Sequence, residues 1–225
     1  MRTDIVTAIE EAGVVAVIRL TDSAALRAVV EALVAGGVRA LEVTMTVPRA
    51  IELIAETAPT LPQGFLIGAG TVLDAATGAR VIDAGAQFVV SPVFRRAIVD
   101  LCHGRDVAVV PGCFSPTEIL DAWDAGADIV KVFPATALGP AFFKDVRAPL
   151  PQVKLMPTGG VSIENAGDWI RAGAVAVGVG AALVDPRAVA EGRFRTITEN
   201  AERIVANVAA ARAACVGRLR RQEAQ

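Results

Sequence analysis

The sequence predicts an α/β protein that forms a single (β/α)8 barrel, or TIM barrel, over residues 1–225, with a short leading helix at its N-terminus. Three observations predict this fold. Apolar segments of strand length begin about every 20 to 26 residues, which leaves room for one helix and two loops between successive strands. Turns with a glycine placed to end a helix, such as Ala35-Gly36-Gly37 and Ala84-Gly85-Ala86, precede several of these segments. No linker or change in composition divides the chain.

The elements follow in a regular order along the chain. Residues 1–12 carry acidic side chains and no long apolar core, so we expect a leading helix there rather than a secretory signal. The expected strands are Val14–Arg19, Ala40–Met45, Leu66–Gly70, Phe88–Ser91, Ala108–Pro111, Ile129–Phe133, Lys154–Met156 and Ala174–Val179. Residues 193–225 are expected to form a closing amphipathic helix, and its inward residues are Ile197, Ile204, Val205 and Val208. A doubly wound open sheet is the alternative, but its Gly-x-Gly-x-x-Gly turn does not follow the first strand.

Composition and charge exclude several classes of partner. The formal net charge of −2 provides no field that would recruit nucleic acid or an anionic membrane surface, so neither is an expected partner. No apolar run reaches membrane-spanning length without a glycine or a charge. The three cysteines are odd in number and widely spaced, which favours a reducing, cytoplasmic location over a disulfide framework. Because His103 is the only histidine, we expect neither a histidine-rich metal site nor a Ser-His-Asp triad, and we predict no metal.

A lysine interrupts one of the most apolar strands. Lys131 stands among Ile129, Val130, Val132 and Phe133, where burial penalises a charged ammonium and favours a neutral, nucleophilic amine. Only three of the 22 basic residues are lysines, and an arginine in this place could not deprotonate. The pattern therefore predicts an amine that takes part in Schiff-base chemistry. The alternative is a lysine near a strand end whose side chain reaches solvent.

Glu42 is a second charged residue inside an apolar strand. It stands between Leu41 and Val43, and Thr44 shares its face because side chains alternate along a strand. An amine that forms an imine needs a proton shuttle beside it, so we predict that Glu42 is the catalytic partner of Lys131. A structural ion pair between the two is the alternative.

Further polar and glycine positions lie at the predicted carboxyl ends of strands, where TIM barrels carry their active sites. The polar residues are Arg19, Thr44, Thr71 and Thr158, and the glycines are Gly159, Gly160, Gly178 and Gly180. The backbone amides of these glycine loops suit a phosphoryl group, with Ser162 expected to cap the helix after the seventh strand. Glycines that only permit tight turns are the alternative. Cys113 also lies near a strand end, but it has no histidine to activate it, so we expect a packed thiol.

Six short strings, taken together, resemble one enzyme family. They are Leu41-Glu42-Val43-Thr44, Gly68-Ala69-Gly70-Thr71-Val72-Leu73, Ser91-Pro92, Val110-Pro111-Gly112, Lys131-Val132-Phe133-Pro134-Ala135 and Pro157-Thr158-Gly159-Gly160-Val161. From about Val14 to Val184 the chain resembles the 2-keto-3-deoxy-6-phosphogluconate (KDPG) aldolases, a family also known for 4-hydroxy-2-oxoglutarate aldolase activity. The resemblance implies a homotrimeric, metal-independent class I aldolase barrel that needs no cofactor, because the substrate is held as a covalent imine on Lys131. Such an enzyme cleaves a phosphorylated keto-deoxy sugar acid into pyruvate and glyceraldehyde 3-phosphate.

The resemblance also implies roles for individual residues. Lys131 would form the imine, and Glu42 would act as the acid and base. The residues implied to bind substrate are Arg19, Thr44, Thr71, Pro92, Phe133 and Thr158. The chain departs from the family at two positions: some members carry an arginine where this chain has Thr46, and many carry a serine where it has Ala181. We therefore expect fewer side-chain contacts to the substrate and only modest discrimination against unphosphorylated analogues.

Three other functions remain open at this point. The chain could be a 2-keto-3-deoxy-6-phosphogalactonate aldolase, a phosphosugar isomerase or epimerase on the same barrel, or a non-catalytic barrel that binds phosphosugars. The isomerases and epimerases typically need metal-binding histidines or a second carboxylate, and neither is evident in the sequence.

Overall fold

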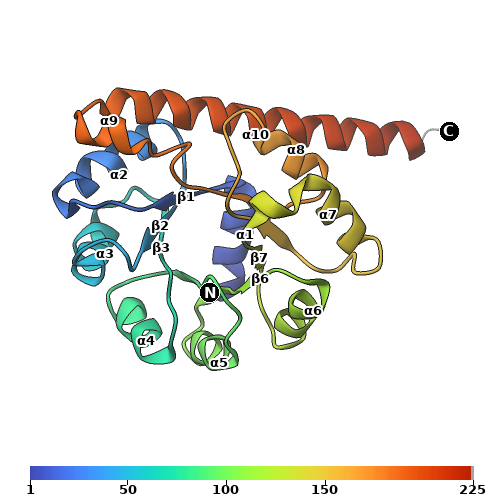
Figure 1. Ribbon diagram of the computed structural model, residues 1–225, viewed down its shortest axis with the longest axis horizontal. Coiled ribbons are helices and arrows are strands. Elements are labelled where there is room, and N and C mark those ends of the chain that lie inside the picture. The colour runs from blue at the N-terminus through green and yellow to red at the C-terminus, as the bar shows by residue number, and fades with distance from the viewer. Residues whose placement is uncertain (224–225) are drawn as a thin grey trace.

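Parallel strands and helices alternate along the computed structural model, which describes residues 1–223 (Figure 1). The strands are β1 (Val14–Ile18), β2 (Ala40–Thr44), β3 (Leu66–Gly70), β4 (Phe88–Val90), β5 (Ala108–Val110), β6 (Gly112–Cys113), β7 (Val130–Val132), β8 (Leu155–Pro157) and β9 (Val177–Val179). The helices are α1 (Arg2–Ala12), α2 (Leu26–Ala35), α3 (Ala50–Thr57), α4 (Ala75–Asp83), α5 (Arg96–Gly104), α6 (Pro116–Asp124), α7 (Gly139–Arg147), α8 (Ala166–Arg171), α9 (Pro186–Ala190) and α10 (Phe194–Glu223). Short 3₁₀ helices, η1 (Ser23–Ala25), η2 (Ala58–Thr60) and η3 (Ala135–Ala137), lie in the connections. Every predicted strand segment overlaps an observed strand, with β8 running one residue beyond the predicted Lys154–Met156, and the predicted leading helix is α1.

The strands curl, and the helices that connect them lie on the outer side (Figure 1). Six strands hydrogen-bond in the order β5-β4-β3-β2-β1-β9, and three more in the order β6-β7-β8. All of these pairs are parallel, as expected when a helix joins each strand to the next. The carboxyl ends of the strands therefore point the same way and gather the loops that follow them.

The fifth predicted strand is divided at Pro111. Proline has no backbone N–H for a strand ladder, so β5 ends before it and pairs with β4, whereas β6 begins after it and pairs with β7. The amide of Lys131 donates to the carbonyl of Pro111 at 2.9 Å, which carries backbone contact across the division. Between β8 and β9, Thr158 forms an isolated parallel bridge with Gly178.

The strands enclose an apolar inner core. Its members occupy alternate strand positions and are Val15, Ala40, Leu66, Phe88, Val90, Ala108, Val110, Ile129, Met156 and Ala176. Gly68 leaves room for the ring of Phe88, since a Cβ there would lie 2.4 Å from a ring carbon. Helix α1 packs Val6 and Ile9 against this core at the amino ends of the strands. The base of the inner core is thus filled by apolar side chains.

A larger core lies between the strands and the outer helices. The closing helix α10 contributes Ile197, Ile204 and Val208 to it, with Val205 partly buried at its edge, as the sequence predicts. This helix packs along α2 and α8 (Figure 1). In the part of the chain that the structure describes, no helix combines the length and the apolar character needed to cross a membrane.

Candidate active site

The two charged residues that interrupt apolar strands both belong to the inner face. Glu42 lies two residues beyond the core residue Ala40 on β2, and Lys131 lies two residues beyond Ile129 on β7. Because side chains alternate along a strand, both point inward, one layer nearer the carboxyl ends than the apolar core. The structure therefore brings the predicted pair to the same end of the strands.

Glu42 carries a fully buried carboxyl group. Within residues 1–223, neither Oε1 nor Oε2 finds a donor, and none of the side chain is exposed. Burial raises the pKa of Glu42 above its ordinary value, while the positive charges of Lys131 and Arg19 act in the opposite direction. A carboxyl group in this state is suited to exchange a proton with a ligand that enters the site.

Lys131 is nearly as buried, with 4% of its surface exposed. Its Nζ lies 5.1 Å from the centre of the Phe133 ring, on the same strand face two residues away. No ion pair joins Lys131 to a carboxylate among the described residues, so the alternative of a direct Glu42–Lys131 ion pair is not observed. The amine is left available to a ligand at the carboxyl ends of the strands.

Two glycines make room for the polar side chains, and the sequence analysis did not identify this role. A Cβ on Gly70 would lie 1.9 Å from Oε1 of Glu42, and one on Gly178 would lie 2.4 Å from Oγ1 of Thr158. Thr158 is 5% exposed, and its Oγ1 has no partner in the described chain. These glycines occupy inward positions on β3 and β9, where strand alternation alone would have placed a side chain.

Thr44 uses its hydroxyl group within the protein. Its Oγ1 donates to the carbonyl of Ile18 at 3.2 Å and lies 2.7 Å from Oγ1 of Thr46, so the two threonines form a hydrogen-bonded pair at the carboxyl end of β2. Thr46, which replaces an arginine of some family members, is exposed. Arg19 is also exposed and directly follows β1, where its charge acts on Glu42.

Thr71 directly follows β3 in an unusual backbone conformation. Its φ of 59° lies in the left-handed region, which disfavours residues with a branched Cβ. Strain of this kind often accompanies a functional position.

Pro92 is half-buried after β4, next to the buried Ser91, whose Oγ accepts a hydrogen bond from the amide of Val93 at 3.3 Å.

The loop after β8 has a conformation that only glycine adopts easily. Gly159 and Gly160 have φ values of 89° and 73°, so tight turning alone requires glycine at both positions. The expected helix cap at Ser162 is wrong, because α8 begins only at Ala166. The Oγ of Ser162 instead accepts from the amide of Asn165 at 3.2 Å, and Oδ1 of Asn165 accepts from the amide of Ser162, so the two residues stabilise a turn that precedes α8.

The amides of these loops are partly unused. No acceptor is found for the amide of Gly160 or of Ala181 within residues 1–223. Gly178 lies inside β9, whereas Gly180 has open space, with its nearest contact 3.8 Å away at the carbonyl of Val17. Thr136 of η3, which the sequence analysis missed, lies against the glycine loop: a Cβ on Gly160 would lie 3.0 Å from its Oγ1.

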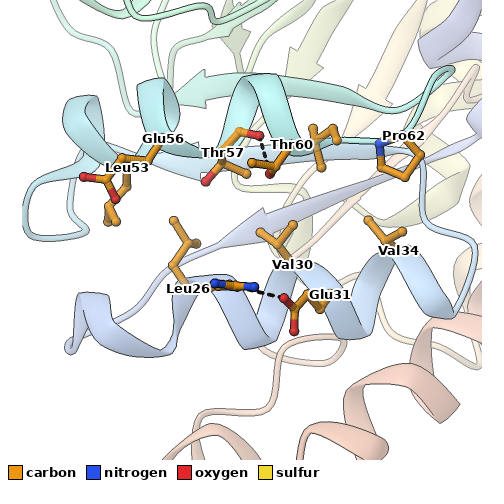
Figure 2. A pocket seen from close by; sticks show the side chains of 11 residues that line it. Leu26, Val30, Glu31, Val34, Leu53, Glu56, Thr57, Thr60 and Pro62 are labelled. Carbon is orange, nitrogen blue, oxygen red and sulfur yellow. Dashed lines mark hydrogen bonds and ion pairs between the residues drawn. The ribbon is translucent and has the colours of Figure 1, made fainter.

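A separate groove lies on the outer surface between α2 and the α3–η2 segment (Figure 2). It has a volume of about 540 Å³, with Leu26, Val30 and Leu53 among its apolar lining residues. Arg27 and Glu31 pair at 2.9 Å along one side of it. None of the predicted site residues lines this groove, so its size does not connect it with the chemistry of Lys131 and Glu42.

Cys113 and the metal-binding residue types were the other features to check for a reactive site. Cys113 is buried, its Sγ donates to the carbonyl of Glu118 at 3.2 Å, and burial raises the pKa of the thiol to about 12. The expectation of a packed thiol is confirmed. Among the described residues, no group of three or more His, Cys, Asp or Glu side chains is placed to hold a metal ion.

Comparisons with known proteins agree on one family. The model of the KDPG and KHG aldolases matches residues 5–200. A 2-dehydro-3-deoxy-phosphogluconate aldolase of Treponema pallidum is 38% identical over 168 residues, which cover 74% of this chain and 80% of the relative. A protein of Rhizobium meliloti, named "Probable 2-dehydro-3-deoxy-6-phosphogalactonate aldolase", is 36% identical over 177 residues, which cover 78% of this chain and 84% of the relative.

The fold of this chain also matches that of a solved KDPG aldolase structure. The KDPG aldolase from Legionella pneumophila, with pyruvate captured at low pH as a covalent carbinolamine intermediate, superimposes with a TM-score of 0.82 at 31% identity. The superposition covers 88% of this chain and 97% of that structure. The chain therefore belongs to the KDPG and KHG aldolase family, and it is a carbon–carbon lyase.

Proposed function

We propose that the protein is a class I aldolase that cleaves 2-keto-3-deoxy-6-phosphogluconate into pyruvate and glyceraldehyde 3-phosphate through an imine on Lys131. The observation that carries this proposal is the inner layer beyond the apolar core. Among the described residues, this layer contains an amine without an ion-pair partner and, at the same end of the strands, a buried carboxyl group without a hydrogen-bond partner. Unpartnered polar groups in a buried layer are costly unless a ligand completes them.

The reaction begins with the amine of Lys131. Its Nζ attacks the C2 ketone to form a carbinolamine, which loses water to give a protonated imine. The C3–C4 bond then breaks, and its electron pair moves into the imine to form an enamine. The C4 hydroxyl group loses its proton as the aldehyde forms. Protonation of the enamine at C3 and addition of water release pyruvate and restore the amine.

Glu42 is proposed to move the protons of these steps. Its carboxylate takes the proton of the C4 hydroxyl group, and the resulting acid returns a proton to the enamine. Burial raises the pKa of Glu42. A carboxyl group whose pKa is closer to the working pH can both accept and return a proton during the reaction. The space left by Gly70 allows the carboxylate to lie in the inner layer without displacing β3.

The carboxylate of the pyruvyl unit would bind beside Lys131. Arg19 offers a guanidinium group matched to a carboxylate, and Thr71 offers a hydroxyl group held by its unusual backbone conformation. Thr158 would lie beside the imine, and its Oγ1, which has no partner among the described residues, would bond to the substrate. The other proposed contacts along this pocket are Thr44, Pro92 and Phe133.

The phosphoryl group is proposed to bind to the loops after β8 and β9. The amides of Gly160 and Ala181 have no acceptor among the described residues, so they are available to an anion. Gly159 and Gly180 keep side chains out of these loops, whereas Gly178 lies inside β9 and leaves room for Thr158. Ala181 offers no hydroxyl group, so the backbone amides would provide most of the binding.

The two groups of strands are proposed to form one closed (β/α)8 barrel that makes up a single domain over residues 1–225. Counting β5 and β6 as one strand gives eight. The hydrogen bond from Lys131 to Pro111 supports continuity on one side of the ring, and the bridge between Thr158 and Gly178 supports it on the other.

We further propose that three chains assemble through a surface formed by Leu73, Val93 and Phe114. These large apolar side chains follow β3, β4 and β6 and are 54%, 43% and 42% exposed. Apolar side chains exposed together on neighbouring loops are typical of a protein–protein interface. A ring of three copies would cover this surface through one repeated contact.

Reductive trapping tests the aldolase assignment. Pyruvate with borohydride should inactivate the enzyme and add a stable label, which peptide mapping should place on Lys131. Lys144 and Lys154, the other lysines of the chain, provide internal controls. A label on either of them, or no label, would overturn the class I mechanism. It would favour the isomerase, epimerase or binding-protein alternatives, none of which needs an imine.

A second candidate substrate is 2-keto-3-deoxy-6-phosphogalactonate, which differs from the first in configuration at C4. The name of the Rhizobium meliloti relative favours it. The kcat/KM values for the two epimers and for 4-hydroxy-2-oxoglutarate, measured side by side, decide between them. A higher value for the galactonate epimer would replace the gluconate assignment while keeping the proposed mechanism.

A further inference from the structure

The outer part of helix α10 lies beyond the region that the family model matches. That match ends at residue 200, whereas α10 continues to Glu223 and runs past α8 (Figure 1). This part of the helix is docked, because Ala201, Ile204, Val208 and Ala211 are all buried in the core beneath it. Asn207 lies on this docked side of the helix, next to Gly167 of α8.

Asn207 is the polar residue that contacts the segment between the glycine loop and α8. Its Nδ2 donates to the carbonyl of Ile163 at 2.9 Å and to the carbonyl of Glu164 at 3.1 Å. Gly167 of α8 leaves room for the amide, since a Cβ there would lie 2.4 Å from its Oδ1. The side-chain NH2 group of Asn207 thus donates one hydrogen bond to each of two consecutive backbone carbonyl groups.

The turn that Asn207 contacts is in turn bonded to the glycine loop. Ser162 and Asn165 bond each other, with the amide of Ser162 donating to Oδ1 of Asn165 at 2.8 Å. The Nδ2 of Asn165 then donates to the carbonyl of Gly160 at 2.9 Å. Hydrogen bonds and the peptide unit between Glu164 and Asn165 therefore connect α10 to Gly160, whose own amide has no acceptor in the described chain.

Arg212 anchors the same part of α10 at its other end. Its Nη1 donates to the carbonyl of Glu11 at 2.8 Å, and its Nη2 donates to the carbonyls of Glu10 and Val175. These bonds join α10 to the end of α1 and to the segment that leads into β9. Asn207 thus lies on a part of α10 that is held by the buried side chains of Ile204 and Val208 and by the hydrogen bonds of Arg212.

We propose that Asn207 is a positioning residue for the phosphoryl group of the substrate. It fixes the turn from Ser162 to Asn165, and through Asn165 it holds the carbonyl of Gly160, so it restricts the backbone of the residue whose amide is proposed to meet the phosphoryl group. This inference rests on the proposed function, because it takes the glycine loop as the phosphate site. The competing explanation is that Asn207 only satisfies two carbonyl groups and holds α10 in place.

Kinetics on paired substrates separate these explanations. Asn207→Asp keeps the shape of the side chain but loses both donors, and Asn207→Ala serves as a second variant. For phosphorylated substrate we expect KM to rise about tenfold, the worth of one to two neutral hydrogen bonds, with kcat nearly unchanged. For 4-hydroxy-2-oxoglutarate we expect kcat/KM to stay within about twofold. The matched control is Arg203→Ala, which removes only the exposed ion pair to the side chain of Glu164.

A binding measurement separates failure of this inference from failure of the aldolase assignment. Inorganic phosphate should shift the backbone amide resonance of Gly160, and it should bind about tenfold more weakly to Asn207→Asp. If pyruvate labels no lysine but this weakening occurs, the aldolase assignment fails and the role of Asn207 stands. If both substrates lose activity equally, or if only thermal stability falls, Asn207 has a structural role and the inference is wrong. Absence of any phosphate effect at Gly160 in the wild type also overturns it.

Discussion

Replacing Gly70 with alanine should disable the enzyme through Glu42. The new Cβ would lie 1.9 Å from Oε1 of Glu42, about 1.5 Å short of ordinary van der Waals contact. It would also lie 2.6 Å from Cδ and 2.7 Å from Cγ, so rotation of the carboxylate alone cannot relieve the clash. Because Glu42 is fully buried, either its whole side chain or strand β3 must move.

The size of the effect follows from this displacement. A misplacement of about 1 Å in a reacting group costs roughly 10²-fold in rate. We therefore expect kcat of Gly70→Ala to fall about 10²-fold or more. Overpacking in the inner layer should also lower the free energy of unfolding by about 1 to 3 kcal/mol. Lys131 is not touched, so reduction with pyruvate and borohydride should still label it after prolonged incubation.

Steady-state kinetics, thermal unfolding and the labelling reaction together test this prediction. The matched control is Gly104→Ala at the end of α5, where the new Cβ would meet no atom within 4 Å. The double variant Gly70→Ala with Glu42→Gln should be no slower than Glu42→Gln alone, because the loss acts through the carboxylate. A folded Gly70→Ala enzyme with kcat within about threefold of the wild type would refute the reasoning.

Three further predictions concern the mechanism, the strained backbone and the assembly. Glu42→Gln should slow turnover by about 10² to 10⁴-fold and abolish the decline in kcat as the pH falls through the raised pKa of Glu42. Because the pKa of Glu42 is raised in the folded protein, its carboxyl group binds a proton more tightly there than in the unfolded chain. The folded protein therefore loses stability as the pH rises through the raised pKa and Glu42 ionises. Glu42→Gln removes this ionisation, so it should raise the melting temperature more at pH 8 than at pH 4. Thr71→Gly should stabilise the fold by about 1 kcal/mol, because it relieves the left-handed conformation, yet raise the KM for substrate; an unchanged KM would remove Thr71 from the site. Phe114→Glu should convert a trimer into monomers in sedimentation velocity, and an unchanged mass would place the interface elsewhere.

The sequence by itself predicted the succession of the strands and the pair of residues proposed for the centre of the candidate site. Lys131 and Glu42 could be identified because a charge inside an apolar strand is costly and therefore informative wherever it occurs. The period of two along a strand also placed both side chains on one face without knowledge of the neighbouring strands. The short spacing between strands predicted parallel pairing through outer helices, and the structure has this arrangement.

Only the tertiary structure decided how that site is accommodated and supported. Gly70 appears in the sequence as an ordinary strand glycine, and its role emerges because β3 pairs with β2 in a register that sets it opposite Thr44, beside Glu42. The start of α8 at Ala166 also escaped the local pattern, since Ser162 can cap a turn as readily as a helix. Asn207 contacts residues 43 and 44 positions earlier in the chain, a separation at which local periodicity carries no information. Strand faces follow from local chemistry, whereas the neighbours that fill or leave space on those faces depend on how distant segments pack.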